Sequence, residues 1–332
     1  MGEFLFSKGA VLVEQQPTQS PAEPGVSKVL QSPETNWLIG ENGVRSGWRL
    51  LTYFVIVLLL GTVITFGLRQ LHRAASGPPS STSQLEQELA GFAVVFAAAL
   101  IMSRLEGRAV GNYGLPLRGL LGGEFWLGFL LGIVEICLLI GLINAFGGYA
   151  FGRLALHGGE IVRWGMFHLL LFFFVGLFEE FLFRGYSQFT LGDGIGFWPA
   201  AVLLSTTFGA AHLLNPGEGL VGAASVVLVG LSFCFTLHRT GNLWYAVGWH
   251  ASFDWGESYL FSVPNSGTVM QGHLSNAILH GPTWLTGGSV GPEGSVFCFV
   301  TMGLQFLIVA WLFPAKKERE SELGSVTARQ MN

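Results

Sequence analysis

Charged residues are scarce in this sequence. Asp, Glu, Lys and Arg make up 11% of its 332 residues, whereas an ordinary soluble domain carries about 25%. Because charged side chains keep a folded surface in water, this deficit excludes a typical soluble globular protein. Hydrophobic residues account for 50% of the chain, and the mean hydropathy is +0.51. We therefore predict an integral membrane protein with the lipid bilayer as its surroundings.

Cysteine and basic charge are scarce too. The three cysteines, Cys137, Cys234 and Cys298, lie in apolar segments without zinc-ligand spacing, which excludes a disulfide scaffold and a cysteine-based metal site. The formal net charge of -4 offers no basic surface for nucleic acid, so no nucleic-acid partner is expected. No apolar run follows a basic start, so the sequence does not predict a secretory signal.

The two ends of the chain lack long apolar runs. Residues 1–47 include a stretch rich in Gln, Ser, Pro and Glu, which predicts a disordered cytoplasmic tail. Residues 315–332 are charged and are predicted to form a second cytoplasmic tail. The transmembrane helical domain is therefore expected over residues 48–314.

Long uncharged runs recur through that domain. A helix needs about 20 mainly apolar residues to cross the hydrocarbon core, and lipid cannot satisfy a loose backbone. We predict an all-α bundle of about eight transmembrane helices with a site cavity between helices. The segments are 50–68, 89–103, 125–152, 164–178, 195–214, 220–237, 242–261 and 295–313. Whether the short segment 89–103 spans is left open, and six or seven helices remain alternatives.

Loop charges predict the orientation. With the N-terminus inside, most Lys and Arg fall in cytoplasmic segments, and the stretch 262–294 contains neither residue. By the positive-inside rule, this distribution predicts an even number of helices with both termini cytoplasmic. We expect a multi-pass protein of a prokaryotic cell membrane.

A paired carboxylate motif stands at the end of segment 164–178. It reads Glu179-Glu180-Phe-Leu-Phe-Arg184, and ionisable groups at membrane depth usually have a partner or a function. Glu180 and Arg184 are four residues apart on a helix, which favours an ion pair. Glu179 lies about 140° around the helix from Arg184, so it is the candidate general base. The alternative is a charge cluster where a helix meets the interface.

Two histidine motifs follow on later segments. Phe208-Gly-Ala-Ala-His212 ends one apolar run, and His250-Ala-Ser-Phe-Asp254 lies within another. His250 and Asp254 share one helix face, so both can point into a common cavity. The alternatives are an interfacial histidine at His212 and a simple buried hydrogen bond between His250 and Asp254.

Together the three motifs are typical of a hydrolytic site. Glu179 would deprotonate a water molecule that His212 helps to position, and His250 with Asp254 would stabilise the oxyanion. An equally economical hypothesis places zinc on Glu179, His212 and His250, with water as the fourth ligand. No cofactor is certain, and zinc is the candidate.

The ordered trio E-E-x-x-x-R, F-x-x-x-H and H-x-x-x-N/D resembles the CPBP family over about residues 164–257. This family comprises CAAX prenyl endopeptidases and bacteriocin-processing or immunity proteins, and is also called the Abi family. The resemblance implies a helical bundle with a conical cavity open to the membrane. It also implies endoproteolysis of a peptide or a membrane-associated protein.

The resemblance further implies roles for individual residues. Glu179 and His212 would activate water, while His250 and Asp254 would form the oxyanion site. Glu180, Arg184 and Phe208 would support them. Asp254 stands where the prenyl-endopeptidase branch has Asn, and an ionised Asp cannot donate a hydrogen bond to an oxyanion. This departure leaves both the metal-free and the metal-dependent mechanism open.

A different class of function remains as the alternative. Intramembrane Glu, Arg, His and Asp could form a proton relay in a transporter, or the bundle could be a non-proteolytic scaffold or immunity protein. Transporters usually contain internal repeats, and no motif recurs in the first half of the chain. Glu135, alone in segment 125–152, is expected to hydrogen-bond across helices.

Overall fold

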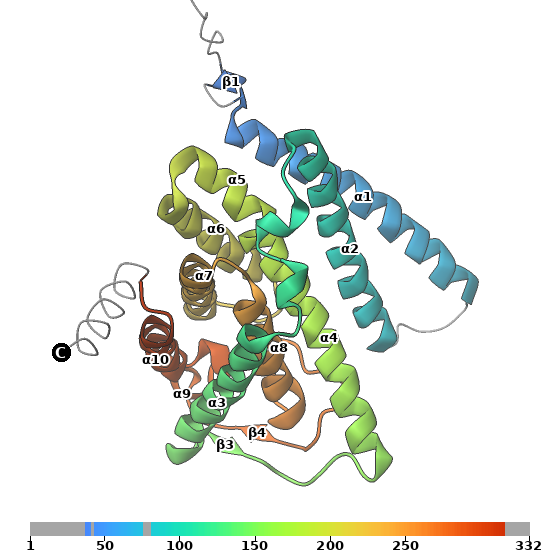
Figure 1. Cartoon of the computed structure of the whole chain (residues 1–332). Coiled ribbons are helices and arrows are strands. Elements are labelled where there is room, and N and C mark those ends of the chain that lie inside the picture. Colours follow the sequence, from blue (N-terminus) through green and yellow to red (C-terminus); the bar gives the residue numbers. More distant parts are fainter. Residues whose placement is uncertain (1–36, 41–42, 76–80, 316–332) are drawn as a thin grey trace, which may run out of the picture. The chain divides into compact units, whose positions relative to one another are not determined.

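The computed structural model describes residues 37–40, 43–75 and 81–315 (Figure 1). Most of the tail predicted over 1–47, and all but the first residue of the tail predicted over 315–332, lie outside these ranges and stay predictions. The chain divides into one unit that ends at Gly43 and a second that begins at Val44. Two short strands, β1 (Ile39–Gly40) and β2 (Gly43–Val44), stand at that boundary.

From Val44 onward the protein is an all-α membrane bundle, as predicted. Its helices are α1 (Ser46–Ala75), α2 (Ser81–Glu106), α3 (Gly123–Ala145), α4 (Gly159–Arg184), α5 (Tyr186–Ile195), α6 (Phe197–His212), α7 (Leu220–Thr240), α8 (Trp244–Trp255), α9 (Thr283–Thr286) and α10 (Val296–Leu312). Short helical turns are η1 (Val110–Tyr113), η2 (Leu117–Gly119), η3 (Gly256–Leu260) and η4 (Pro292–Gly294). Strands β3 (Tyr149–Ala150) and β4 (Ile278–Leu279) pair antiparallel.

Five helical segments of the described chain are long and apolar enough to cross a membrane. They are Ser46–Leu71, Ser83–Glu106, Gly123–Ala145, Gly159–Ile195 and Leu220–Thr240. The segment predicted at 89–103 is therefore part of a longer helix of spanning length. The helices α6, α8 and α10, found within segments 195–214, 242–261 and 295–313, are shorter.

The helices at two of the predicted segments have other bounds than the segments themselves. The helix expected over 125–152 ends at Ala145, because Gly147 takes a left-handed φ of 77° and the chain then enters β3. The helix expected over 164–178 begins earlier, at Gly159, and continues to Arg184. Glu179, Glu180 and Arg184 therefore lie on one helix, as the predicted i,i+4 pair requires.

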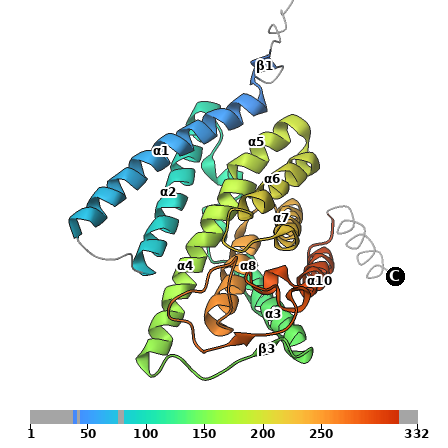
Figure 2. The same ribbon diagram turned by 180° about the vertical axis from the view of Figure 1, so that it is seen from behind.

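Small residues bring α8 against its neighbours, and α8 lies between α3 and α4 in both views (Figures 1 and 2). Gly128 and Gly132 are four residues apart on α3, as are Gly248 and Ser252 on α8. A methyl group at Gly132 would overlap the Ser252 hydroxyl and a backbone carbonyl of α8. Such small-xxx-small pairs let helix backbones approach closely in membranes, and they hold α8 in the middle of the bundle.

The helix α4 also approaches α8 at a glycine. A methyl group at Gly176 would lie 3.3 Å from the His250 Cβ atom. Glu179 and Glu180 follow within about one helical turn, since a turn contains 3.6 residues. The glycine contact therefore brings both carboxylates to the level of His250.

A polar cluster ties four elements together at one end of α2. The Glu106 carboxylate accepts hydrogen bonds from Arg49 of α1, at 2.9 and 2.6 Å, and from Tyr113 of η1, at 2.8 Å. Tyr186 of α5 donates a further hydrogen bond to the same carboxylate. Because each partner comes from a different element, this cluster fixes α1, α2, η1 and α5 to one another.

Candidate active site

A buried ion pair anchors the glutamate motif. Arg184 Nη1 lies 3.2 Å from Glu180 Oε1, and both side chains are 0% exposed. The guanidinium carbon of Arg184 stands 4.3 Å from the centre of the Phe208 ring, a distance typical of a cation–π contact. A methyl group at Gly230 would overlap this guanidinium, so the glycine of α7 leaves the space that Arg184 fills.

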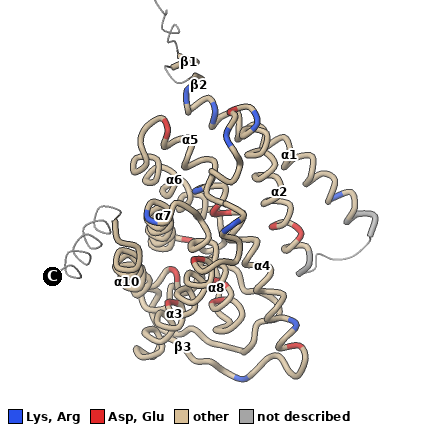
Figure 3. The backbone as a smooth tube through the Cα atoms, viewed as in Figure 1, with Lys and Arg blue, Asp and Glu red and all other residues tan. Residues whose placement is uncertain are grey.

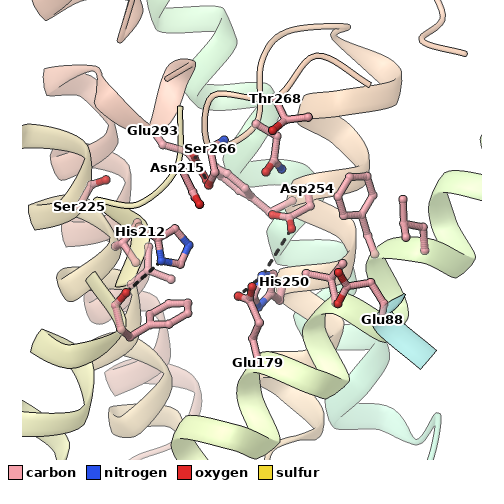
Figure 4. Close-up of a pocket in the computed structure, with 18 of the residues that line it drawn as sticks. Glu88, Glu179, His212, Asn215, Ser225, His250, Asp254, Ser266, Thr268 and Glu293 are labelled. Carbon is pink, nitrogen blue, oxygen red and sulfur yellow. Dashed lines mark hydrogen bonds and ion pairs between the residues drawn. The ribbon is translucent and has the colours of Figure 1, made fainter. Parts of the chain in front are cut away.

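His250 lies among three carboxylates, of which Figure 4 shows Glu179 and Asp254. Its Nδ1 atom is 3.0 Å from Glu180 Oε1, while Nε2 is 3.4 Å from Asp254 Oδ2 and 3.6 Å from Glu179 Oε2. A ring nitrogen must carry hydrogen to donate to a carboxylate. The ring form that satisfies both sides is therefore the imidazolium. Glu180 contacts His250 as well as Arg184, a double contact that the i,i+4 spacing alone did not predict.

His212 stands on another wall of the same cavity. Its Nδ1 atom lies 2.9 Å from the Phe208 carbonyl oxygen, which can only accept. Nδ1 therefore carries the hydrogen, and in the neutral ring Nε2 is an acceptor. The structure thus brings Glu179, His250 and Asp254 into direct contact and sets His212 across the cavity from them (Figure 4).

The cavity has a volume of about 360 Å³ and is lined from several directions. Residues of α2, α4, α6, α7, α8 and α10 contribute, together with Asn215 and the loop 262–294. Figure 3 shows several acidic positions around α8 in the interior of the bundle. Sequence reasoning missed nine polar lining residues: Gln84, Gln87, Glu88, Asn215, Ser225, Asn265, Ser266, Thr268 and Glu293.

The loop 262–294 holds Glu293 in place. Backbone bonds join Asn265 and Thr268 in both directions, at 3.0 and 2.8 Å, and Ser266 and Gly267 between them have φ of 44° and 80°. Two positive φ values are typical of a type I′ turn. Ser266 N and Oγ donate to Glu293 Oε2 at 2.9 and 3.1 Å. Burial and the negative charge of Asp254 raise the pKa of Glu293 to about 8.

The ligand set considered for zinc does not form a metal-binding group. Among the residues that the structure describes, no three His, Cys, Asp or Glu side chains are arranged to hold one ion. Both ring nitrogens of His250 face carboxylates, and His212 lies apart from Glu179.

Glu135 shows that a single polar residue can be structural. Its Oε2 atom accepts a hydrogen bond of 2.9 Å from Trp249 Nε1, which joins α3 to α8. The expected hydrogen bond across helices is confirmed. Because Trp249 precedes His250, this bond also fixes the part of α8 that carries the histidine.

The predicted site residues lie within a segment that matches a known protein family. Residues 161–256 match the family model of type II CAAX prenyl endopeptidase Rce1-like proteins. The match confirms the resemblance over this segment, which includes Glu179, His212, His250 and Asp254. No curated protein matches the chain. The match supports a protease-like function of the CAAX type for this multi-pass membrane protein.

Proposed function

We propose that this protein is an intramembrane endopeptidase that cleaves a peptide or a membrane-associated protein. The observation that carries the proposal is the contact of Glu179, His250 and Asp254 on one wall of the cavity that His212 also lines. A general base, an acceptor imidazole and a cationic donor are the groups that hydrolysis of an amide needs.

Water activation falls to Glu179 and His212. The Glu179 carboxylate takes a proton from a water molecule that donates its other hydrogen to His212 Nε2, the acceptor of the neutral ring. The oxygen then adds to the carbonyl carbon of the scissile bond. Glu179 returns the proton to the amide nitrogen, the C–N bond breaks, and an acid and an amine leave.

His250 stabilises the negative charge that forms on the carbonyl oxygen. The positive charge of the imidazolium stabilises this oxyanion, and the hydrogen that can be donated to it is that on Nε2, which in the structure lies 3.4 Å from Asp254 and 3.6 Å from Glu179. Asp254 cannot donate when ionised, so its role is to orient His250 through Nε2. Glu180, Arg184 and Phe208 support the ring from the other side through the buried ion pair and its aromatic contact.

Charge distribution supports the orientation. We place both termini in the cytoplasm of a prokaryotic cell. In this orientation most Lys and Arg residues lie in cytoplasmic segments, as the positive-inside rule requires. The loop 262–294, without Lys or Arg, is then on the opposite side. This loop closes part of the cavity.

The decisive experiment is cleavage of an internally quenched peptide library by the full chain in nonionic detergent. The Glu179→Gln variant should lose activity roughly a thousandfold, as removal of a general base does, and should keep the wild-type thermal unfolding profile. Glu160→Gln, a change of the same chemistry at an exposed position, is the matched control. Equal activity of Glu179→Gln and wild type would contradict the proposal.

Two further measurements separate the alternatives. Incubation with 1,10-phenanthroline should leave cleavage intact, whereas loss of activity that zinc restores would favour the metal hypothesis.

Proteoliposomes with a pH gradient test the proton relay. A gradient that collapses faster with wild type than with Glu179→Gln, without cleavage of any peptide, would favour a transporter.

A further inference from the structure

Acidic residues predominate among the charged residues that line the cavity. Four carboxyl groups line it, from Glu88, Glu179, Asp254 and Glu293, while none of the described lining residues is Lys or Arg. Two histidines also line the cavity, but His212 donates to a backbone carbonyl and His250 serves other carboxylates. Among the described lining residues the cation is therefore the His250 imidazolium, which contacts Glu179, Glu180 and Asp254 and is outnumbered by the four carboxyl groups of the cavity.

The four acids fall into two classes. Glu179 and Asp254 contact His250 and belong to the segment that matches the protease family. Glu88 and Glu293 lie outside residues 161–256, and neither makes an ion pair with a residue in the described ranges. Glu88 is half-buried on α2, and Glu293 receives only hydrogen bonds from Ser266.

Glu88 and Glu293, the two acids without an ion pair in the described ranges, flank the reactive groups. Figure 4 shows Glu88 and Glu293 on opposite sides of the Glu179–His250 contact. A polypeptide that lies across Glu179 therefore passes both of them. Gln84 and Gln87 also line the cavity from α2, on the helix face that carries Glu88, because residues three and four apart are neighbours. Their amides can donate to and accept from a peptide backbone.

A carboxylate that is removed from water without a cation is costly, and a cation supplied by a ligand offsets that cost. The pKa of Glu293, raised to about 8 by burial and by Asp254, has the direction expected for an acid without such a cation. Hydrogen bonds in which the donor or the acceptor is charged are also stronger than those between neutral groups. A ligand with an ammonium or guanidinium group would therefore bind more tightly than its neutral analogue.

We propose that the cavity selects polypeptide segments that carry Lys or Arg beside the cleaved bond, with Glu88 or Glu293 binding the cationic side chain according to the side of the bond on which it lies. This inference rests on the proposed function, because it names the substrate class of the same site.

Binding is tested separately from cleavage. In the Glu179→Gln background, fluorescence anisotropy compares apolar peptides that differ at one position, which carries Lys, norleucine or Glu and is moved along the peptide. The Lys peptide should bind about tenfold more tightly than the norleucine peptide at its best position, as one charge-assisted hydrogen bond provides. The Glu peptide should bind most weakly. Nonionic detergent avoids a charge preference of the micelle.

Variants identify the acids. Adding Glu88→Gln and Glu293→Gln together should reduce the ratio of Lys to norleucine affinity to near one, while adding Glu160→Gln should leave it unchanged. Adding Glu88→Lys should turn the preference toward the Glu peptide, a reversal that a merely unfolded variant could not give. Equal affinity of the Lys and norleucine peptides, or a ratio that survives the double change, would overturn the inference.

The two proposals can fail independently. If wild type cleaves none of the peptides while the Glu179→Gln protein prefers the Lys peptide, the hydrolytic function is wrong and the cationic site stands. If wild type cleaves Lys and norleucine peptides with the same kcat/KM and binds them equally, the function stands and the selection of basic residues is wrong.

Discussion

His250 Nδ1 lies 3.0 Å from Glu180 Oε1, a shorter contact than the 3.6 Å between its Nε2 atom and Glu179. The second glutamate of the motif therefore holds the imidazole, together with Arg184 on the same oxygen. The first glutamate is less tightly engaged and lines the cavity. The two adjacent carboxylates therefore have different roles: Glu180 positions His250, and Glu179 faces the cavity. Because Arg184 binds the same Glu180 oxygen, the position of His250 depends on the buried ion pair.

Loss of Arg184 should strongly destabilise the protein. Arg184→Met removes one of the two cations that contact the fully buried Glu180 and leaves the His250 imidazolium as the other, and breaking a buried pair costs about 3–5 kcal/mol. Thermal unfolding in detergent measures the change, with Arg163→Met at an exposed position as the control. Glu180→Gln combined with Arg184→Met should be less destabilised than Arg184→Met alone, because no charge remains unpaired. Additive effects of the two changes would argue against the pair.

Asp254 is expected to act by orientation rather than by charge. Asp254→Asn keeps an oxygen that accepts from His250 Nε2, so kcat should stay within about tenfold of wild type, while Asp254→Ala should lower it roughly a hundredfold, the cost of a misplaced catalytic group. The kcat and KM of both variants on one cleaved peptide decide this. Equal loss in the two variants would mean that the negative charge itself is needed.

The close packing of α3 on α8 should be necessary for activity. Gly132→Ala forces a methyl group into the Ser252 hydroxyl, and such overpacking costs about 1–3 kcal/mol. Gly141→Ala on the same helix is the matched control, because nothing lies within 4 Å of a methyl group there. Unfolding temperature and peptide cleavage should both fall for Gly132→Ala alone. Two equally active variants would show that α8 does not depend on this contact.

Glu293 should make stability depend on pH. Its pKa is raised from 4.5 to about 8 in the folded protein, so the folded state holds this proton more tightly than the unfolded chain. The stabilisation is complete below about pH 4.5 and is lost as the pH rises toward 8. Glu293→Gln should lack this component.

A series of unfolding temperatures between pH 5 and pH 8 measures it. The wild-type value should fall by about 5 °C more than that of Glu293→Gln over this range. Glu160→Gln should follow the wild type. Parallel curves for wild type and Glu293→Gln would contradict the raised pKa.

Much of the site could be predicted from short spacings along one helix. The i,i+4 relation alone indicated that Glu180 could pair with Arg184 and that His250 could share a face with Asp254. Apolar runs of spanning length likewise predicted the helical bundle. These patterns are local, so a sequence displays them directly.

The missing parts depend on contacts between distant segments. Glu293 reaches the cavity because a type I′ turn at Ser266 holds its carboxylate, and nothing in the spacing of the two residues indicates this. Glu88 stood one residue before a predicted span, so its place on a buried face of α2 was not apparent. The end of the helix at Ala145 had a local cause, the left-handed Gly147, that an apolar run conceals.

The polar cluster at Glu106 has a mechanical consequence. The helix α2 packs on α1 and α4, and Glu106 fixes one of its ends to α1, η1 and α5. Glu88 lies 18 residues earlier on the same helix, about 27 Å away at 1.5 Å per residue. At that distance, a change of about 5° in the tilt of α2 at Glu106 would displace Glu88 by about 2 Å. The hydrogen bonds to Glu106 thus help to fix the position of Glu88 in the cavity wall, although they lie far from the cavity.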